Sequence, residues 1–123
     1  KDTQIDIIHL ITPASSKERI AAIKKIASGF IYYVTSYGVT GERANFAQDL
    51  RKRIELVKKT LELPICAGFG ISTAEQAKTI SAYSDGIIIG SAIQKVIEAK
   101  SSNVDACAKS LHEYAKEIAK AIH

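Results

Sequence analysis

The sequence predicts an α/β protein built around a sheet of parallel strands. Short apolar runs alternate with amphipathic helical patterns along all 123 residues, and the runs are nearly continuous, as in strands covered on both faces. Each run also stops at a turn that carries glycine or serine. Two architectures fit this pattern. One is an open, doubly wound sheet, and the other is half of a (β/α)₈ barrel, because a complete barrel needs about 250 residues.

The first strand–helix pair occupies the N-terminal 29 residues. Residues 5–11 form a run of apolar residues that predicts a buried strand. Ser15 and Glu18 have the spacing of a capping box, which predicts a helix that ends at Gly29. The inner stripe of this helix is expected to be Ile20, Ile23 and Ile26.

The second and third strands flank a long helix. Residues 30–35 are β-branched and aromatic, which favours a strand, and a polar loop follows from Ser36 to about Gln48. Pro64 ends the helix and starts the next strand, residues 65–68. The apolar positions of the helix between them lie on one face: Leu50, Ile54, Val57 and Leu61.

The last third of the chain predicts one further strand and three helices. Ser72 and Glu75 repeat the capping-box spacing before a helix whose inner positions are Ala74, Ala77 and Ile80. Residues 87–89 form the fourth strand, and residues 92–99 form a short helix. Residues 101–103 can cap the terminal helix. Its expected buried stripe is Val104, Ala108, Leu111, Ala115, Ile118 and Ile122.

Composition argues against nucleic-acid binding, membrane insertion and a metal site. The net charge is +4, but the lysines are spread along helices and form no basic stripe interleaved with aromatic residues. No apolar run approaches the roughly 20 residues of a membrane span. The three histidines are isolated, and Cys66 and Cys107 read as buried thiols of a reducing cytoplasm. The chain begins at Lys1 and lacks methionine, which indicates a fragment or a processed chain.

Two glycine-bearing turns predict a phosphate site. Gly68-Phe69-Gly70 follows the third strand, and Gly90-Ser91 follows the fourth. Barrel phosphate sites use the loops after the last two strands together with a short extra helix, which residues 92–99 supply. Glycine lets the backbone approach phosphate oxygens, and Ser91 can add a hydroxyl group. The alternative is that these are ordinary turn glycines.

A third feature is the loop after the second strand. It spans roughly a dozen residues, which is long for a connection between a strand and a helix. Gly38 and Gly41 flank Val39-Thr40 and could serve as the hinges of a lid. The alternative is a surface loop without a chemical role.

Together, these motifs resemble the tryptophan synthase alpha subunit family. The resemblance rests on the segments GVTG (38–41), GFGIS (68–72) and GSAI (90–93), and it extends over essentially all 123 residues. It implies that residues 1–123 form the C-terminal half of a single TIM (β/α)₈ barrel, with four βα units and the terminal helix. A different phosphate-sugar barrel, such as an isomerase of the same pathway, remains an alternative, against which the GVTG segment argues.

The resemblance implies a retro-aldol cleavage of indole-3-glycerol phosphate to indole and glyceraldehyde 3-phosphate. By the same resemblance, the substrate phosphate is bound by Gly41, Phe69, Gly70, Gly90 and Ser91. Tyr32 matches an active-site tyrosine, and Thr40 matches a lid threonine that bonds the catalytic aspartate. No position of this chain matches the catalytic glutamate and aspartate, which are expected in the missing N-terminal half.

The resemblance also implies the partners. Indole passes to a beta subunit that carries pyridoxal phosphate, in an α2β2 heterotetramer, and the alpha subunit itself needs no cofactor. An alternative function is a non-catalytic alpha-type subunit that binds and activates a beta subunit. The lid sequence Thr35-Ser36-Tyr37 departs from relatives that have serine first and smaller or basic residues after it, which affects how the lid packs when closed.

Overall fold

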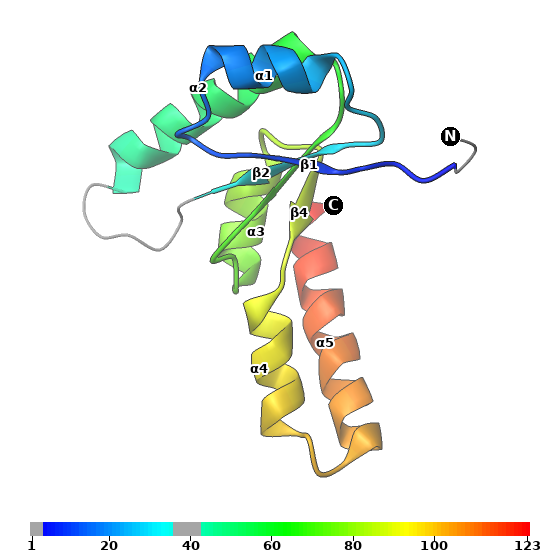
Figure 1. Cartoon of the computed structure of the whole chain (residues 1–123). Helices are drawn as coiled ribbons and strands as arrows, with labels where there is room; N and C mark the ends of the chain where they lie inside the picture. Colours follow the sequence, from blue (N-terminus) through cyan, green and yellow to red (C-terminus); the bar gives the residue numbers. More distant parts are fainter. Residues whose placement is uncertain (1–3, 36–42) are drawn as a thin grey trace.

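The computed structural model describes residues 4–35 and 43–123, without the side chains of residues 43–48. Strands and helices alternate, and two helices follow the last strand (Figure 1). The elements are β1 (His9–Ile11), α1 (Lys17–Lys24), β2 (Ile31–Val34), α2 (Arg43–Leu61), β3 (Ile65–Gly68), α3 (Ala74–Ser81), β4 (Gly86–Ile88), α4 (Ser91–Ala99) and α5 (Val104–Ile122).

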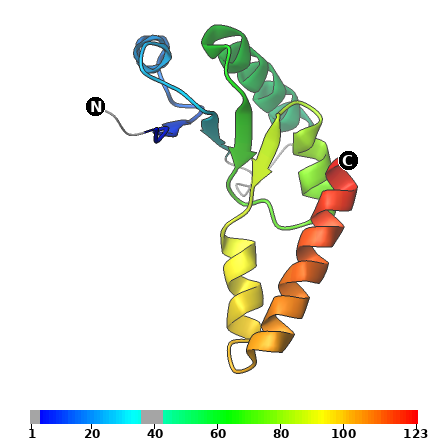
Figure 2. The same cartoon turned by 90° about the vertical axis from the view of Figure 1, so that its right-hand side faces the viewer.

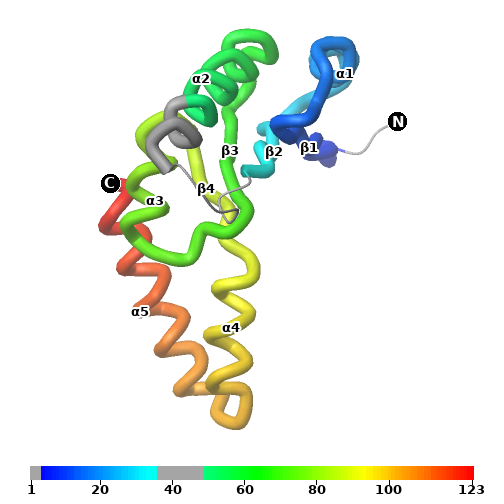
Figure 3. Tube along the Cα trace, turned by 90° about the vertical axis from the view of Figure 1, so that its left-hand side faces the viewer, coloured from blue at the N-terminus to red at the C-terminus, as the bar shows by residue number. Residues whose placement is uncertain are grey.

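The strand order decides between the two architectures. The four strands lie in the order β1-β2-β3-β4, and every neighbouring pair is parallel. A doubly wound sheet reverses its strand order at a switch point, whereas right-handed crossovers that always step the same way keep their helices on one face. Figure 3 shows α1, α2 and α3 following one another in an arc around the strands. The chain therefore has the winding of half a barrel.

One face of the sheet packs against the helices and forms the core. Strand residues Ile11, Ile31, Tyr33, Ile65 and Ala67 are buried on this face. The predicted inner face of α2 is confirmed, since all four of its expected positions are at most 5% exposed: Leu50, Ile54, Val57 and Leu61. Packing of this stripe holds α2 against the sheet, and α1 packs in turn against α2 (Figure 1).

The opposite face of the sheet is only partly covered by the described residues. The strand register aligns Leu10, Tyr32, Cys66 and Gly86 in one row across all four strands. Leu10 is 50% exposed, and Tyr32 and Cys66 are partly buried. Burial raises the pKa of the Cys66 thiol, and the charge of Asp85 raises it further. In a closed barrel, this row would face the interior.

The helices α4 and α5 form an antiparallel hairpin that extends away from the sheet (Figure 2). The expected stripe of α5 is wrong at Val104, Ala108 and Ala115, which are exposed, because the helix faces the core with Tyr114, Ile118 and Ile122. Ile118 is buried as expected, and Leu111 and Ile122 are partly buried. Tyr114, which the pattern did not select, contacts the core, and its hydroxyl donates to Ser72 O at 3.0 Å.

Two boundaries near the N-terminus differ from expectation. The first strand pairs only over His9–Ile11, because its partner β2 begins at Ile31, which lies opposite His9. Helix α1 ends at Lys24, five residues before Gly29, so Ile26 lies beyond the helix and is 68% exposed. Gly29 instead adopts φ of +69°, in the left-handed region that glycine favours, and turns the chain into β2.

Asn103 caps α5 as expected, whereas the two expected capping boxes are each displaced by one residue. Ser15 Oγ accepts from Thr12 N in a turn, which leaves Ser16 to cap α1 by accepting from Arg19 N. Thr73, and not Ser72, caps α3, in a capping box with Gln76. In both places two adjacent hydroxyl residues can serve as the cap, and the neighbouring turn decides which one does.

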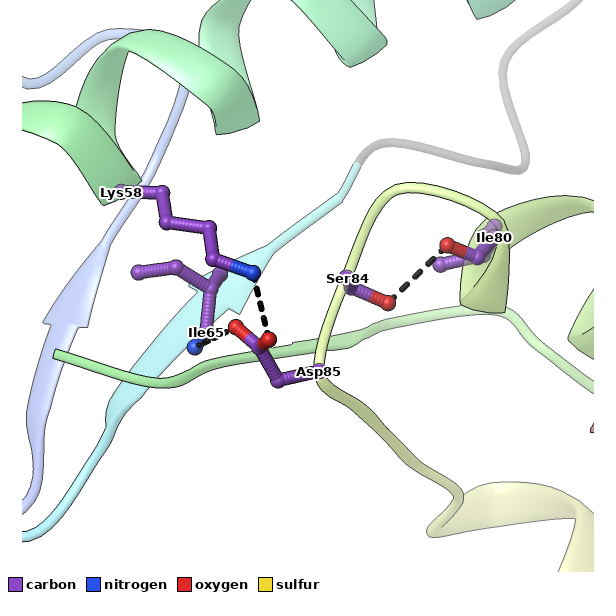
Figure 4. Close-up of polar contacts among 5 residues, drawn as sticks. All are labelled: Lys58, Ile65, Ile80, Ser84 and Asp85. Carbon is purple, nitrogen blue, oxygen red and sulfur yellow. Dashed lines mark hydrogen bonds and ion pairs between the residues drawn. The ribbon is translucent and has the colours of Figure 1, made fainter.

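A polar cluster fixes the amino ends of β3 and β4 (Figure 4). Asp85 Oδ2 accepts from Ile65 N at 2.9 Å, and Lys58 Nζ donates to Asp85 Oδ1 at 2.5 Å. Burial acts to raise the pKa of Asp85, but the hydrogen bonds from Lys58 and Ile65 and the charge of Lys58 outweigh it and lower the pKa. Ser84 Oγ donates to Ile80 O close by. In barrels this amino-terminal edge contributes to stability.

Candidate functional site

The predicted phosphate residues lie at the carboxyl edge of the sheet. The register places Val34, Gly68 and Ile88 side by side on β2, β3 and β4. The loop after β3 and the loop after β4 therefore start from adjacent positions. Their expected phosphate residues are all exposed: Phe69, Gly70, Gly90 and Ser91.

The turn after β3 has an unusual backbone. Phe69 has φ of +102° and Gly70 has φ of +77°, so two consecutive residues occupy left-handed backbone space. Glycine adopts this conformation readily, but for phenylalanine it costs on the order of 1–3 kcal/mol and must be held by surrounding contacts. Phe69 nevertheless leaves its side chain 60% exposed, so burial of the ring does not hold it.

Thr35 supplies contacts that hold this turn. It directly follows β2 and is completely buried. Its N–H donates to Gly68 O at 2.7 Å, and its hydroxyl donates to Gly68 O at 2.9 Å and to Phe69 O at 3.1 Å. Thr35 is not among the predicted site residues. A hydroxyl residue placed directly after a buried strand is the sequence signal that could have found it.

Tyr32 lies beside the same turn. A Cβ atom added to Gly68 would stand 2.8 Å from Tyr32 Cε2 and 2.8 Å from Ile88 O. Gly68 therefore allows β4 and the Tyr32 ring to approach β3 closely. This contact puts the predicted active-site tyrosine and the Gly68-Phe69-Gly70 turn at the same part of the sheet edge.

The two helix N-termini at this edge differ in their free donors. At α3, Gln76 Oε1 accepts from Ser72 N and Thr73 N, and Glu75 adds a negative charge to the first turn. Helix α4 begins after Gly90, which provides no side-chain cap, and its first turn has no acidic residue. At α3 the Thr73 hydroxyl already accepts from Gln76 N, whereas the N–H groups at the start of α4 have no side-chain cap and can bind an anion.

Two predicted residues, Thr40 and Gly41, lie outside the described residues, as does most of the expected lid. Within the part of the chain that is described, no group of three histidine, cysteine, aspartate or glutamate side chains could hold a metal ion. Among those residues, no helix is long and apolar enough to cross a bilayer.

Comparison with known families identifies the family of this chain. The family model for the tryptophan synthase alpha chain matches residues 1–123. The chain belongs to the tryptophan synthase alpha chain family. The tryptophan synthase alpha chain of Leptospira interrogans (serovar copenhageni) is 58% identical over 115 residues, which cover 94% of this chain and 44% of that protein. The alpha chain of Leptospira borgpetersenii is 59% identical over the same share of each chain.

Solved alpha-chain structures share the fold. The tryptophan synthase alpha chain of Legionella pneumophila superposes with a TM-score of 0.73 at 30% identity, over 95% of this chain and 42% of that one. Tryptophan synthase of M. tuberculosis gives 0.74 at 26% identity, over 97% and 41%. The chain thus spans less than half the length of the curated relatives it matches, and its fold corresponds to the C-terminal half of their barrel.

Proposed function

We propose that this chain is the phosphate-binding half of a tryptophan synthase alpha chain, a lyase that cleaves indole-3-glycerol phosphate to indole and glyceraldehyde 3-phosphate. The observation that carries the proposal is the uncapped N-terminus of α4 next to the exposed turn at Phe69 and Gly70. Both loops follow strands that are neighbours in the sheet. Membership of the family supports a phosphate ester as the ligand of this site.

The unpaired edges of the sheet support the proposal that residues 1–123 form half of a barrel. Strands β1 and β4 are the outer strands of the sheet, and each has one side unpaired within the described residues. The partly exposed row of Leu10, Tyr32 and Cys66 lies on the face that a closed barrel fills with side chains. Closure by four further strands would cover both features and remove the two edges.

The phosphate site would act by anchoring the substrate. Backbone N–H groups of Gly70, Gly90 and Ser91 would bind the dianion, so that binding energy from the phosphate positions the reacting end of the substrate. Phe69 would lie at the rim of the pocket, and Tyr32 would face the substrate from β2. The proton transfers would fall to a glutamate and an aspartate of the other half of the barrel.

The lid and the partner are part of the same proposal. Gly41 would add a phosphate contact, and Thr40 would bond the catalytic aspartate when the lid closes and excludes water. The alpha chain would work in the cytoplasm without a cofactor and deliver indole to a beta subunit that carries pyridoxal phosphate, in an α2β2 assembly. The two free cysteines among the described residues agree with a reducing compartment.

An assay of indole release tests this function. The complete alpha chain is incubated with indole-3-glycerol phosphate, alone and with its beta subunit, and indole is quantified. Indole release that requires both the substrate and the alpha chain is the expected result. Stimulation of the beta subunit without any indole release would instead favour the non-catalytic alpha-type subunit. The absence of both indole release and stimulation would refute the assignment.

A further inference from the structure

Thr35 links the end of β2 to the turn that carries the candidate phosphate donors. Among the described residues it is the only polar residue that is completely buried. A buried hydroxyl is costly unless it forms a hydrogen bond, and this one donates to two successive carbonyl oxygens, Gly68 O at 2.9 Å and Phe69 O at 3.1 Å. Its only acceptors are thus in the turn, and none is in its own strand.

Holding these two carbonyls also sets the direction of two N–H groups. In a trans peptide unit the C=O and the N–H of the next residue point in opposite directions, and the described chain contains no cis peptide bond. Gly68 O shares its peptide unit with Phe69 N–H, and Phe69 O shares its unit with Gly70 N–H. With both oxygens held toward Thr35, both N–H groups are directed away from it, out of the buried end of β2.

The same contact stabilises an otherwise unfavourable backbone. Phe69 and Gly70 both have positive φ, at +102° and +77°, and the Phe69 ring is mainly exposed. The Thr35 N–H bonds only Gly68 O, so the hydroxyl is the side-chain group that reaches the peptide between Phe69 and Gly70. Loss of the hydroxyl would leave this peptide free to rotate.

We propose that Thr35 is a positioning residue for phosphate binding, whose hydroxyl holds Phe69 O and so fixes the Gly70 N–H group in the orientation that binds the anion. This inference rests on the proposed function, because it assumes that the turn binds the substrate phosphate. Thr35 acts through the turn and does not itself touch the phosphate.

The test compares Thr35→Val with Thr35→Ser in the complete alpha chain. Valine keeps the shape but removes the hydroxyl, and serine keeps the hydroxyl but removes a methyl group. Calorimetric titration with glycerol 3-phosphate is expected to show about tenfold weaker binding for T35V, equivalent to about 1.4 kcal/mol. T35S should bind within about threefold of the wild type, and KM for indole-3-glycerol phosphate should rise in T35V with a much smaller change in kcat.

A core variant separates positioning from a general loss of stability. Ile54 is completely buried in α2, away from the turn, so Ile54→Val should lower the melting temperature without changing phosphate affinity. If T35V does not fold, Thr35→Ala replaces it in the comparison with T35S. Equal affinity of wild type and T35V would overturn the role of Thr35 and leave the phosphate site standing. Absence of binding by the wild type would overturn both.

Discussion

The close approach of strands at Gly68 can be tested by a single methyl group. A Cβ atom at this position would stand 2.8 Å from Ile88 O, 2.8 Å from Tyr32 Cε2 and 2.9 Å from Ile88 Cβ. Non-bonded carbon atoms prefer separations of about 3.5–4.0 Å. Gly68→Ala therefore requires β4 and the Tyr32 ring to move away from β3.

The size of the effect follows from which atoms must move. Overpacking by a methylene group costs about 1–3 kcal/mol, and we expect the upper part of this range because Ile88 belongs to the paired strand β4. Gly90→Ala is the matched control, since a Cβ atom there would meet nothing within 4 Å. Gly86→Ala is intermediate, because its nearest neighbour is Cys66 Sγ at 3.0 Å, the end of a movable side chain.

Urea denaturation of the complete alpha chain measures the free energy of unfolding of the three variants. The free energy of unfolding should fall by about 2–3 kcal/mol for Gly68→Ala, by less than about 1 kcal/mol for Gly86→Ala, and by no more than about 0.5 kcal/mol for Gly90→Ala. A Gly68→Ala protein as stable as the Gly90→Ala protein would refute the close approach of β3, β4 and Tyr32 described above.

Two further predictions concern the stability of the fold. Because the pKa of Asp85 is lowered in the folded protein, the stability it contributes is present above its unfolded pKa of about 4 and is lost as the pH falls through the lowered value. Asp85→Asn should therefore flatten the dependence of the unfolding free energy on pH between about 5 and 2, and an unchanged slope would contradict the assignment. Thr73→Ala removes the cap of α3 and should cost about 1 kcal/mol in urea denaturation, whereas Ser72→Ala, which lies beside the cap, should cost less; equal losses would contradict the observed cap.

The sequence predicted elements well where periodicity and burial agree. The stripe of α2, from Leu50 to Leu61, is regular over three turns and packs against the sheet along its whole length. The pattern of α5 is equally regular, but Val104, Ala108 and Ala115 are exposed, whereas Tyr114 and Ile118 contact the core. Periodicity identifies a face of a helix, whereas burial depends on which element lies opposite.

The glycines of the candidate site could be predicted from the sequence, but the hydrogen bonds that hold the turn could not. Positions such as Gly70 and Gly90 stand out because glycine interrupts an apolar run, and the family motifs mark them further. The sequence marks Thr35 only as a hydroxyl residue at the end of a buried strand, whereas its contact with Gly68 O depends on the register of β2 and β3. The choice between Ser15 and Ser16 as a cap likewise depends on the turn at Thr12.

The most direct test of the central claim is calorimetric titration of glycerol 3-phosphate into the complete alpha chain and its two Gly90 variants. Gly90→Ala adds a methyl group in open space, whereas Gly90→Asp adds a negative charge at the same position. The account predicts binding by the wild type, and binding by Gly90→Asp at least about tenfold weaker than by Gly90→Ala, since a like charge beside the anion opposes its binding. No binding by the wild type, or equal binding by all three proteins, would contradict it.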